Sequence, residues 1–154
     1  MANDDVKNVT RADLIAALND DLSREYQAII AYVVYSQTIK GAQYMAIKEE
    51  LEKHAKEELA HALTVAKNIG YLGGTITATP KPVKTSDKAT DMLRFDLDNE
   101  NDTVKQYRLR VRQCEALQEY GIAEDIREIL RQEQEHQSDL ADALGEDVPD
   151  VSKL

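Results

Sequence analysis

The chain has 154 residues, enough for one domain with a core of its own. Its formal net charge of −10, with no basic cluster in residues 1–7, argues against a nucleic-acid partner, which needs a basic patch or arm. The single cysteine, Cys114, can form no disulfide within the chain, which favours a reducing, cytoplasmic location.

Four long helices are predicted in an all-α protein, because the chain has three prolines and is rich in Leu, Ala, Glu, Lys and Gln. They span residues 10–40, 42–69, 87–118 and 122–144, between tails at 1–9 and 145–154, in a single domain covering 1–154. The first tail lacks the apolar segment of a signal peptide. The longest apolar run, residues 28–35, is too short to cross a membrane, so no membrane partner is expected.

The ends of the first two helices carry recognisable signals. Thr10 and Asp13 have the spacing of a capping box at the start of the first helix. Gly41 follows the first helix and Gly70 the second, as glycines commonly do after a helix end.

Residues 71–86 differ from the rest of the chain. Gly73-Gly74, Pro80 and Pro82 predict an irregular connection or a short strand-like piece. A connection of this length can cross a whole bundle, so the helices before and after it can run parallel.

A repeated motif stands out in the second and fourth helices. Glu58 precedes His61 by three residues and Glu133 precedes His136 by three, so each pair places a carboxylate and an imidazole on one helix face. Glu25 and Glu100 each lie 33 residues ahead of the leading glutamate of a pair. The two halves of the chain therefore form a faint internal repeat.

These six residues are expected to converge. Gly41 lies about midway between Glu25 and Glu58, which places the two glutamates level in a helical hairpin, whereas the second hairpin must turn before Gly121. All six interrupt apolar seams, where unpaired carboxylates are costly to bury. Two divalent cations would balance four carboxylates, so the site is expected to be neutral only when loaded. Imidazole and carboxylate ligands suit iron, manganese or zinc.

The constellation, with Tyr32 seven residues after Glu25, resembles the ferritin family, and in particular the bacterioferritins, over residues 13–144. The resemblance implies a ferritin-like four-helix bundle with a long crossover. It implies a di-iron centre in which Glu58 and Glu133 bridge the two irons. Glu25, Glu58 and His61 would serve one iron, and Glu100, Glu133 and His136 the other. Tyr32 would lie beside the site and supply electrons, or be a core aromatic.

Two departures from the family pattern are visible. Bacterioferritins bind haem through a methionine where this chain has Leu59, so no haem is expected by that route; Met45 and Met92 are typical of core gap-fillers. Residues 146–154, with Pro149, are too short for the fifth helix of the large cages, so no clear fifth helix is expected. A homo-oligomeric shell of 12 subunits is thus an alternative to one of 24.

Further residues have open roles. His54 shares the stripe of Glu58 and is either an additional ligand, a waypoint for incoming iron, or a hydrogen-bonded histidine of the core or an interface. Glu57 and Asp139 either line access routes or belong to solvated faces. Cys114 is expected to be a small core residue.

The resemblance implies iron storage and detoxification by a ferroxidase. Such a protein oxidises Fe(II) with O2 or H2O2 and stores the product in a hollow shell. One alternative is a rubrerythrin-like di-iron oxidase or peroxidase without storage, although the Cys-x-x-Cys module usual in rubrerythrins is missing from the sequence. A second is a DNA-protecting mini-ferritin cage, which the acidic charge disfavours. A third is a structural bundle without metal.

Overall fold

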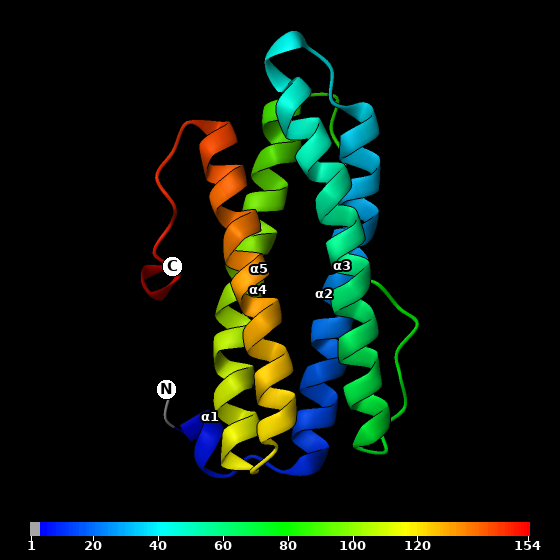
Figure 1. Ribbon diagram of the computed structural model, residues 1–154, viewed down its shortest axis with the longest axis vertical. Coiled ribbons are helices and arrows are strands. Elements are labelled where there is room, and N and C mark those ends of the chain that lie inside the picture. Colours follow the sequence, from blue (N-terminus) through cyan, green and yellow to red (C-terminus); the bar gives the residue numbers. More distant parts are fainter. Residues whose placement is uncertain (1–3) are drawn as a thin grey trace.

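The computed structural model describes residues 4–154 and consists of four long helices (Figure 1). The elements are α1 (Asp4–Lys7), α2 (Arg11–Thr38), the 3-10 helix η1 (Ala42–Tyr44), α3 (Met45–Tyr71), α4 (Ala89–Ala116), α5 (Tyr120–Leu144) and the 3-10 helix η2 (Val151–Lys153). Helices α2 and α3 form one antiparallel hairpin, α4 and α5 form the other, and the hairpins pack side by side. Residues 4–154 contain no strand, so the predicted all-α bundle is confirmed. None of their helices is both long and apolar enough to span a membrane.

The long helices begin and end a few residues from the predicted positions. The start of α2 has the predicted capping box: Oγ1 of Thr10 accepts from the amide of Asp13, whose carboxylate accepts from the amide of Thr10. Residues 42–44, predicted as the first turn of the second helix, form η1 instead. Gly41 precedes them with a φ of +125°, a conformation that side chains disfavour, and it turns the chain into η1.

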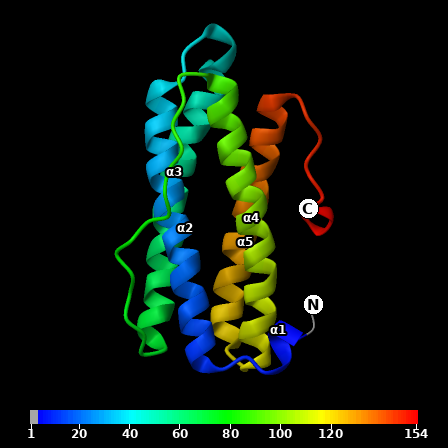
Figure 2. The same cartoon turned by 180° about the vertical axis from the view of Figure 1, so that it is seen from behind.

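The connection between α3 and α4 crosses the length of the bundle without forming the strand-like piece considered above (Figure 2). It lies along α2, where Asn19 donates to the carbonyl of Thr75, Gln27 to that of Pro82 and Tyr35 to that of Lys84. These bonds provide hydrogen-bond donors for backbone carbonyls of the connection, which in a β-strand would pair with a neighbouring strand instead. Helices α3 and α4 therefore run parallel. In the second hairpin the turn at residues 117–119 precedes Gly121, with Gln118 at a φ of 61°.

Both predicted tails contain structure where they are described. Residues 1–3 lie outside the described chain, but residues 4–7 form α1, which contacts α4. At the other end η2 also packs on α4, where Val151 is buried and Lys105 donates to the carbonyl of Leu154. Sequence periodicity gave no sign of these short turns, because contacts with α4 hold them.

The core is divided into two apolar clusters. The cluster around Leu14, Leu18 and Ile126 is formed by side chains from four half-helices: the first halves of α2 and α5, and the last halves of α3 and α4. The cluster around Tyr35, Leu97 and Leu140 contains the opposite halves. Between them lies a layer of buried polar side chains, which is where the candidate site is found.

Candidate metal centre

The six polar residues of the repeated motif meet in this layer. They are Glu25 from α2, Glu58 and His61 from α3, Glu100 from α4, and Glu133 and His136 from α5, and each is at most 3% exposed. Their ligand atoms form two groups, in each of which all atoms lie within 4.8 Å of one another: Glu25, Glu58, His61 and Glu133, and Glu58, Glu100, Glu133 and His136. The structure thus brings together every residue that the motif pointed to.

Glu58 and Glu133 lie between the two histidines. Nδ1 of His61 is 2.9 Å from Oε2 of Glu58 and 3.1 Å from Oε1 of Glu133. Nδ1 of His136 is 3.0 Å from Oε1 of Glu58 and 3.2 Å from Oε2 of Glu133. Each carboxylate therefore directs one oxygen to each histidine. Glu25 approaches His61 and Glu100 approaches His136, in both cases to 3.7 Å.

A buried tyrosine contacts each outer glutamate. Tyr32 donates a 2.5 Å hydrogen bond to Oε1 of Glu100, and Tyr107 donates to Oε1 of Glu25. Burial and the charge of the accepting glutamate raise the pKa of each hydroxyl, so both keep their protons at neutral pH. Sequence reasoning missed Tyr107 as a site residue. Its signal was available, since it follows Glu100 by seven residues as Tyr32 follows Glu25.

Protons are held among these groups. Burial lowers the pKa of His61 and His136, but hydrogen bonds with the surrounding glutamates outweigh it and raise both pKa values. Burial and the charge of Glu133 raise the pKa of Glu58, and they raise that of Glu100 to about 7. Protons can therefore balance part of the carboxylate charge, and the expectation that only cations neutralise the site is too narrow.

The outward-facing nitrogens of the two histidines have different partners. Nε2 of His61 donates to Oε1 of Gln132 at 2.6 Å, while Nε2 of His136 donates to Oε2 of Glu57 at 2.6 Å. Such partners fix the tautomer and orientation of a ligand histidine, leaving Nδ1 to face the carboxylates. The sequence suggested Glu57 only as an access-route residue and did not point to Gln132.

His54 lies beside the six residues, next to His136. Its ring stacks on that of His136 with centroids 4.0 Å apart, and its Nε2 lies 3.1 Å from Oδ2 of Asp139. Ligand atoms of Glu50, His54 and Asp139 also lie within 4.8 Å of one another. Burial and the charge of His136 lower the pKa of His54 to about 4, so it is neutral near pH 7. This position does not distinguish the three roles considered for His54: additional ligand, waypoint for incoming iron, and hydrogen-bonded histidine.

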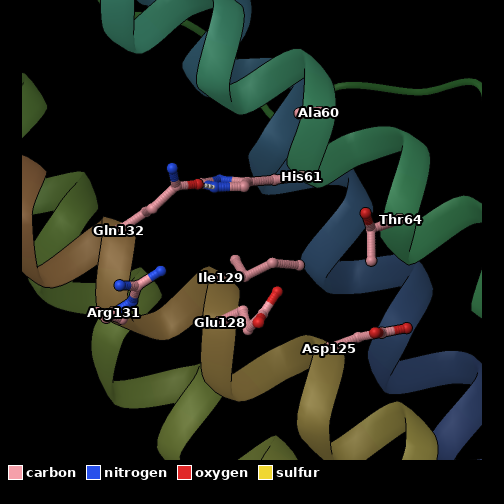
Figure 3. A pocket seen from close by; sticks show the side chains of 8 residues that line it. All are labelled: Ala60, His61, Thr64, Asp125, Glu128, Ile129, Arg131 and Gln132. Carbon is pink, nitrogen blue, oxygen red and sulfur yellow. Dashed lines mark hydrogen bonds between the residues drawn. The ribbon is translucent and has the colours of Figure 1, made fainter.

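A pocket of about 200 Å³ opens beside His61 (Figure 3). Figure 3 shows the hydrogen bond between His61 and Gln132 along one wall, with Asp125, Glu128 and Arg131 also lining the pocket. Of the six central residues, His61 is the one that lines the pocket, so the pocket meets the centre at this ring.

The residues fit a pair of divalent cations. Oε2 of Glu100 and Oε2 of Glu133 are buried and accept no well-formed hydrogen bond from residues 4–154, although Oε2 of Glu133 lies 3.2 Å from Nδ1 of His136. This is unusual for carboxylate oxygens. Cations between the glutamates and the two Nδ1 atoms would supply the missing partners. Carboxylates and imidazoles without a thiolate suit iron, manganese or zinc.

Other residues singled out in the sequence lie away from this cluster. Leu59 is about half exposed, at 53%, and Met45 is exposed too, whereas Met92 is buried in an apolar cluster. Cys114 is fully buried in the other cluster, and burial raises the pKa of its thiol to about 12. It is a core residue, as the sequence led us to expect.

A buried ion-pair network one turn before Glu25 was not predicted. Asp21 accepts hydrogen bonds from Nε of Arg110 at 2.6 Å and from Arg24, and all three side chains are buried. The corresponding residue one turn before Glu100 is Asp96, whose Oδ2 is buried without a partner in the described chain. Burial and the charge of Glu100 raise the pKa of Asp96 well above its usual range.

Comparisons with known proteins agree with this geometry. A family model described as a ferritin-like domain matches residues 15–147. The chain is similar to a solved ferritin-like, diiron-carboxylate protein from Bacillus anthracis strain Ames, with 32% identity and a TM-score of 0.84 over 87% of this chain and 96% of that chain. It is also similar to a dodecameric thioferritin, the bacterioferritin-related protein from Bacteroides fragilis, with 27% identity and a TM-score of 0.82 over 89% of this chain and 87% of that chain. A comparison with curated proteins found no match.

Proposed function

The chain belongs to the ferritin-like family, and on that basis we propose that it is a ferroxidase that oxidises Fe(II) and stores the ferric product in a hollow homo-oligomeric shell. The observation that carries the proposal is the buried convergence of Glu25, Glu58, His61, Glu100, Glu133 and His136 as two overlapping ligand groups. A structural bundle gains nothing from such a layer, because unpaired buried carboxylates destabilise the fold.

The proposed substrate is a pair of Fe(II) ions. Glu58 and Glu133 would bridge them, Glu25 and His61 would complete one position, and Glu100 and His136 the other. The pair gives up two electrons. Hydrogen peroxide takes these electrons with two protons and becomes two waters, or dioxygen takes them with two protons and becomes hydrogen peroxide. The carboxylates hold the ferric product as well as the ferrous substrate, because hard oxygen ligands suit both.

When dioxygen is the oxidant, reducing the hydrogen peroxide to two waters takes two more electrons and two protons. Tyr32 is the proposed source of one of these electrons, and another Fe(II) ion supplies the second. The hydroxyl of Tyr32 lies against Glu100, and burial keeps it protonated, so oxidation of the ring must release that proton to Glu100 or a neighbour. Tyr107 has the corresponding contact with Glu25 and is the matched comparison. We expect Tyr32→Phe to change the number of Fe(II) ions oxidised per dioxygen more than Tyr107→Phe does.

The shell is proposed because apolar side chains gather on the outer face of the first hairpin. Val33, Leu59 and Leu63 are each at least half exposed there, and a largely apolar pocket of about 350 Å³ lies between α2 and α3. Exposed apolar patches of this kind mark protein interfaces. The related protein from Bacteroides fragilis is dodecameric, which supports 12 subunits over 24.

The test combines iron oxidation with sizing of the assembly. Anaerobic protein is mixed with Fe(II) and then with dioxygen or hydrogen peroxide, and ferric absorbance is followed beside Glu58→Ala. We expect fast oxidation by the parent protein and a rate near that of buffer for the variant. Equal rates for parent and variant would contradict the proposal.

Light scattering and elemental analysis separate storage from its alternatives. A particle of 12 or 24 subunits that retains ferric iron supports storage. A monomer or dimer that consumes peroxide would favour the rubrerythrin-like alternative. A DNA complex in a mobility-shift assay at low salt would favour the mini-ferritin alternative.

A further inference from the structure

The two halves of the centre are related by an offset of 75 residues. The offset takes Glu25 to Glu100, Glu58 to Glu133 and His61 to His136. It also takes Glu57, the residue before the first motif, to Gln132, the residue before the second. The six central residues are thus the same type in both halves, whereas the residues at 57 and 132 differ in charge.

These two residues occupy equivalent places. Each bonds the histidine of the other half through Nε2, Glu57 to His136 and Gln132 to His61, with the same distance of 2.6 Å. Figure 3 shows the neutral member of the pair, with the amide of Gln132 meeting the edge of the His61 ring. The geometry is matched and only the chemistry of the acceptor differs.

A carboxylate and an amide affect a ligand histidine differently. A carboxylate that accepts the outer N–H makes the other ring nitrogen a stronger base and adds a negative charge near the cation. An amide oxygen fixes the ring but adds no charge. The side chain of Glu57 is partly exposed, at 20%, and a glutamate carboxyl in contact with solvent is ionised at neutral pH.

Other charges lie near both positions. The exposed Lys53 has its Nζ 3.7 Å from Oε1 of Glu57, while the other oxygen, Oε2, keeps its 2.6 Å contact with His136. Asp125, Glu128 and Arg131 line the pocket beside His61, so two carboxylates and one guanidinium lie on this side. On the other side, the ring of His54 covers His136 and lies against Asp139, which adds another carboxylate to the His136 side.

We infer that the two cation positions are unequal and that Glu57 makes the position at His136 the tighter one, which fills first. The inference rests on the proposed dimetal function. It identifies Glu57 as a positioning residue that acts through His136, and it assigns the looser position to His61, where the pocket opens.

Substoichiometric metal binding tests this inference. Crystals of metal-free protein are given one equivalent of Mn(II) per subunit, and anomalous scattering gives the occupancy beside each histidine. Parent protein should show most of the Mn(II) beside His136. Glu57→Gln should lower affinity there about tenfold, within the 10–100-fold range typical of such partners, and even out the two occupancies.

The reciprocal change makes the test independent of folding effects. Gln132→Glu should raise occupancy beside His61, and the double variant E57Q/Q132E should reverse the order of filling. Glu49→Gln removes the same charge from an exposed position on α3 and should leave the order as in the parent. Calorimetric titration of the parent with Mn(II) should show two binding steps with different affinities. In Glu57→Gln the two affinities should be closer together.

The outcomes distinguish the inference from the proposed function. Equal occupancies in the parent, or an order that neither Glu57→Gln nor the double variant changes, would overturn the inference and leave the dimetal site intact. Parent protein that holds no Mn(II) among the six residues, even at excess, would overturn the proposed function itself.

Discussion

The hydroxyl of Tyr32 donates a 2.5 Å hydrogen bond to Glu100, which lies 68 residues further along the chain. The hydroxyl of Tyr107 contacts Glu25 in the same way, so each half of the bundle supplies a donor to the outer glutamate of the other half. These contacts join the two hairpins across the polar layer and hold the outer carboxylates in place.

Removing either hydroxyl should destabilise the metal-free protein. Tyr32→Phe or Tyr107→Phe leaves a buried carboxylate oxygen without its donor, which should lower the free energy of unfolding by roughly 1–3 kcal/mol. Urea denaturation followed by circular dichroism measures the change. Tyr71→Phe is the control. Because Tyr71 is exposed, this variant should unfold at the same urea midpoint as the parent protein. Parent-like midpoints for both buried variants would show that the hydroxyls contribute nothing to stability.

Asp21 and Asp96 occupy corresponding places in the two hairpins, but replacing each with asparagine should affect the free energy of unfolding differently. Asp21→Asn leaves the buried guanidinium of Arg110 without its carboxylate and should destabilise the protein by about 3–5 kcal/mol. Asp96→Asn should destabilise the protein by less than about 1 kcal/mol at pH 7, or stabilise it, because burial and the charge of Glu100 already disfavour the ionised form of Asp96 in the folded state.

The pH dependence of the Asp96 variant gives a second measurement. A folded-state pKa above the unfolded value near 3.9 means that the parent loses stability as pH rises from that value towards the folded pKa. Asp96→Asn lacks this loss, so its stability relative to the parent should increase with pH over that interval. Urea midpoints at several pH values, measured in the presence of a chelator, would show this increase. A difference that stays constant with pH would contradict the raised pKa of Asp96.

Cation binding should release protons. The pKa values of His61 and His136 are raised by their glutamate neighbours, yet Nδ1 must be unprotonated to bind a cation. Protons therefore compete with cations, and affinity should fall as pH falls. With one proton displaced per cation, the Kd for Mn(II) should weaken about tenfold from pH 7 to pH 6. Calorimetry in two buffers of different ionisation enthalpy counts the protons, and equal heats in both buffers would contradict their release.

Cys114 should be unreactive in the folded protein. It is fully buried, and burial raises its thiol pKa to about 12, so almost no thiolate is present near neutrality. Labelling with an aromatic disulfide reagent at pH 8 should therefore be slower than in urea by several orders of magnitude. Because it is the chain's single cysteine, one absorbance trace reports it directly. Rapid labelling of native protein would mean that this part of the core opens readily.

The sequence by itself determined the four helices and the residues that would face one another. Helical periodicity and end signals are local, so they located α2 to α5 to within a few residues. The spacing of Glu58 from His61, and of Glu133 from His136, fixed which helix face each pair shares, since three residues is about one turn. Whether these residues bind metal remains a prediction for the experiments above.

Only the tertiary structure decided which atoms meet across the bundle. It directed Nδ1 of both histidines inward and gave His136 a carboxylate and His61 an amide as outer partners. It paired Asp21 with Arg110 and folded the two tails against α4. These contacts depend on the rotation and relative height of helices distant in sequence, and side-chain packing between helices sets both, whereas the periodicity of a single helix does not encode them.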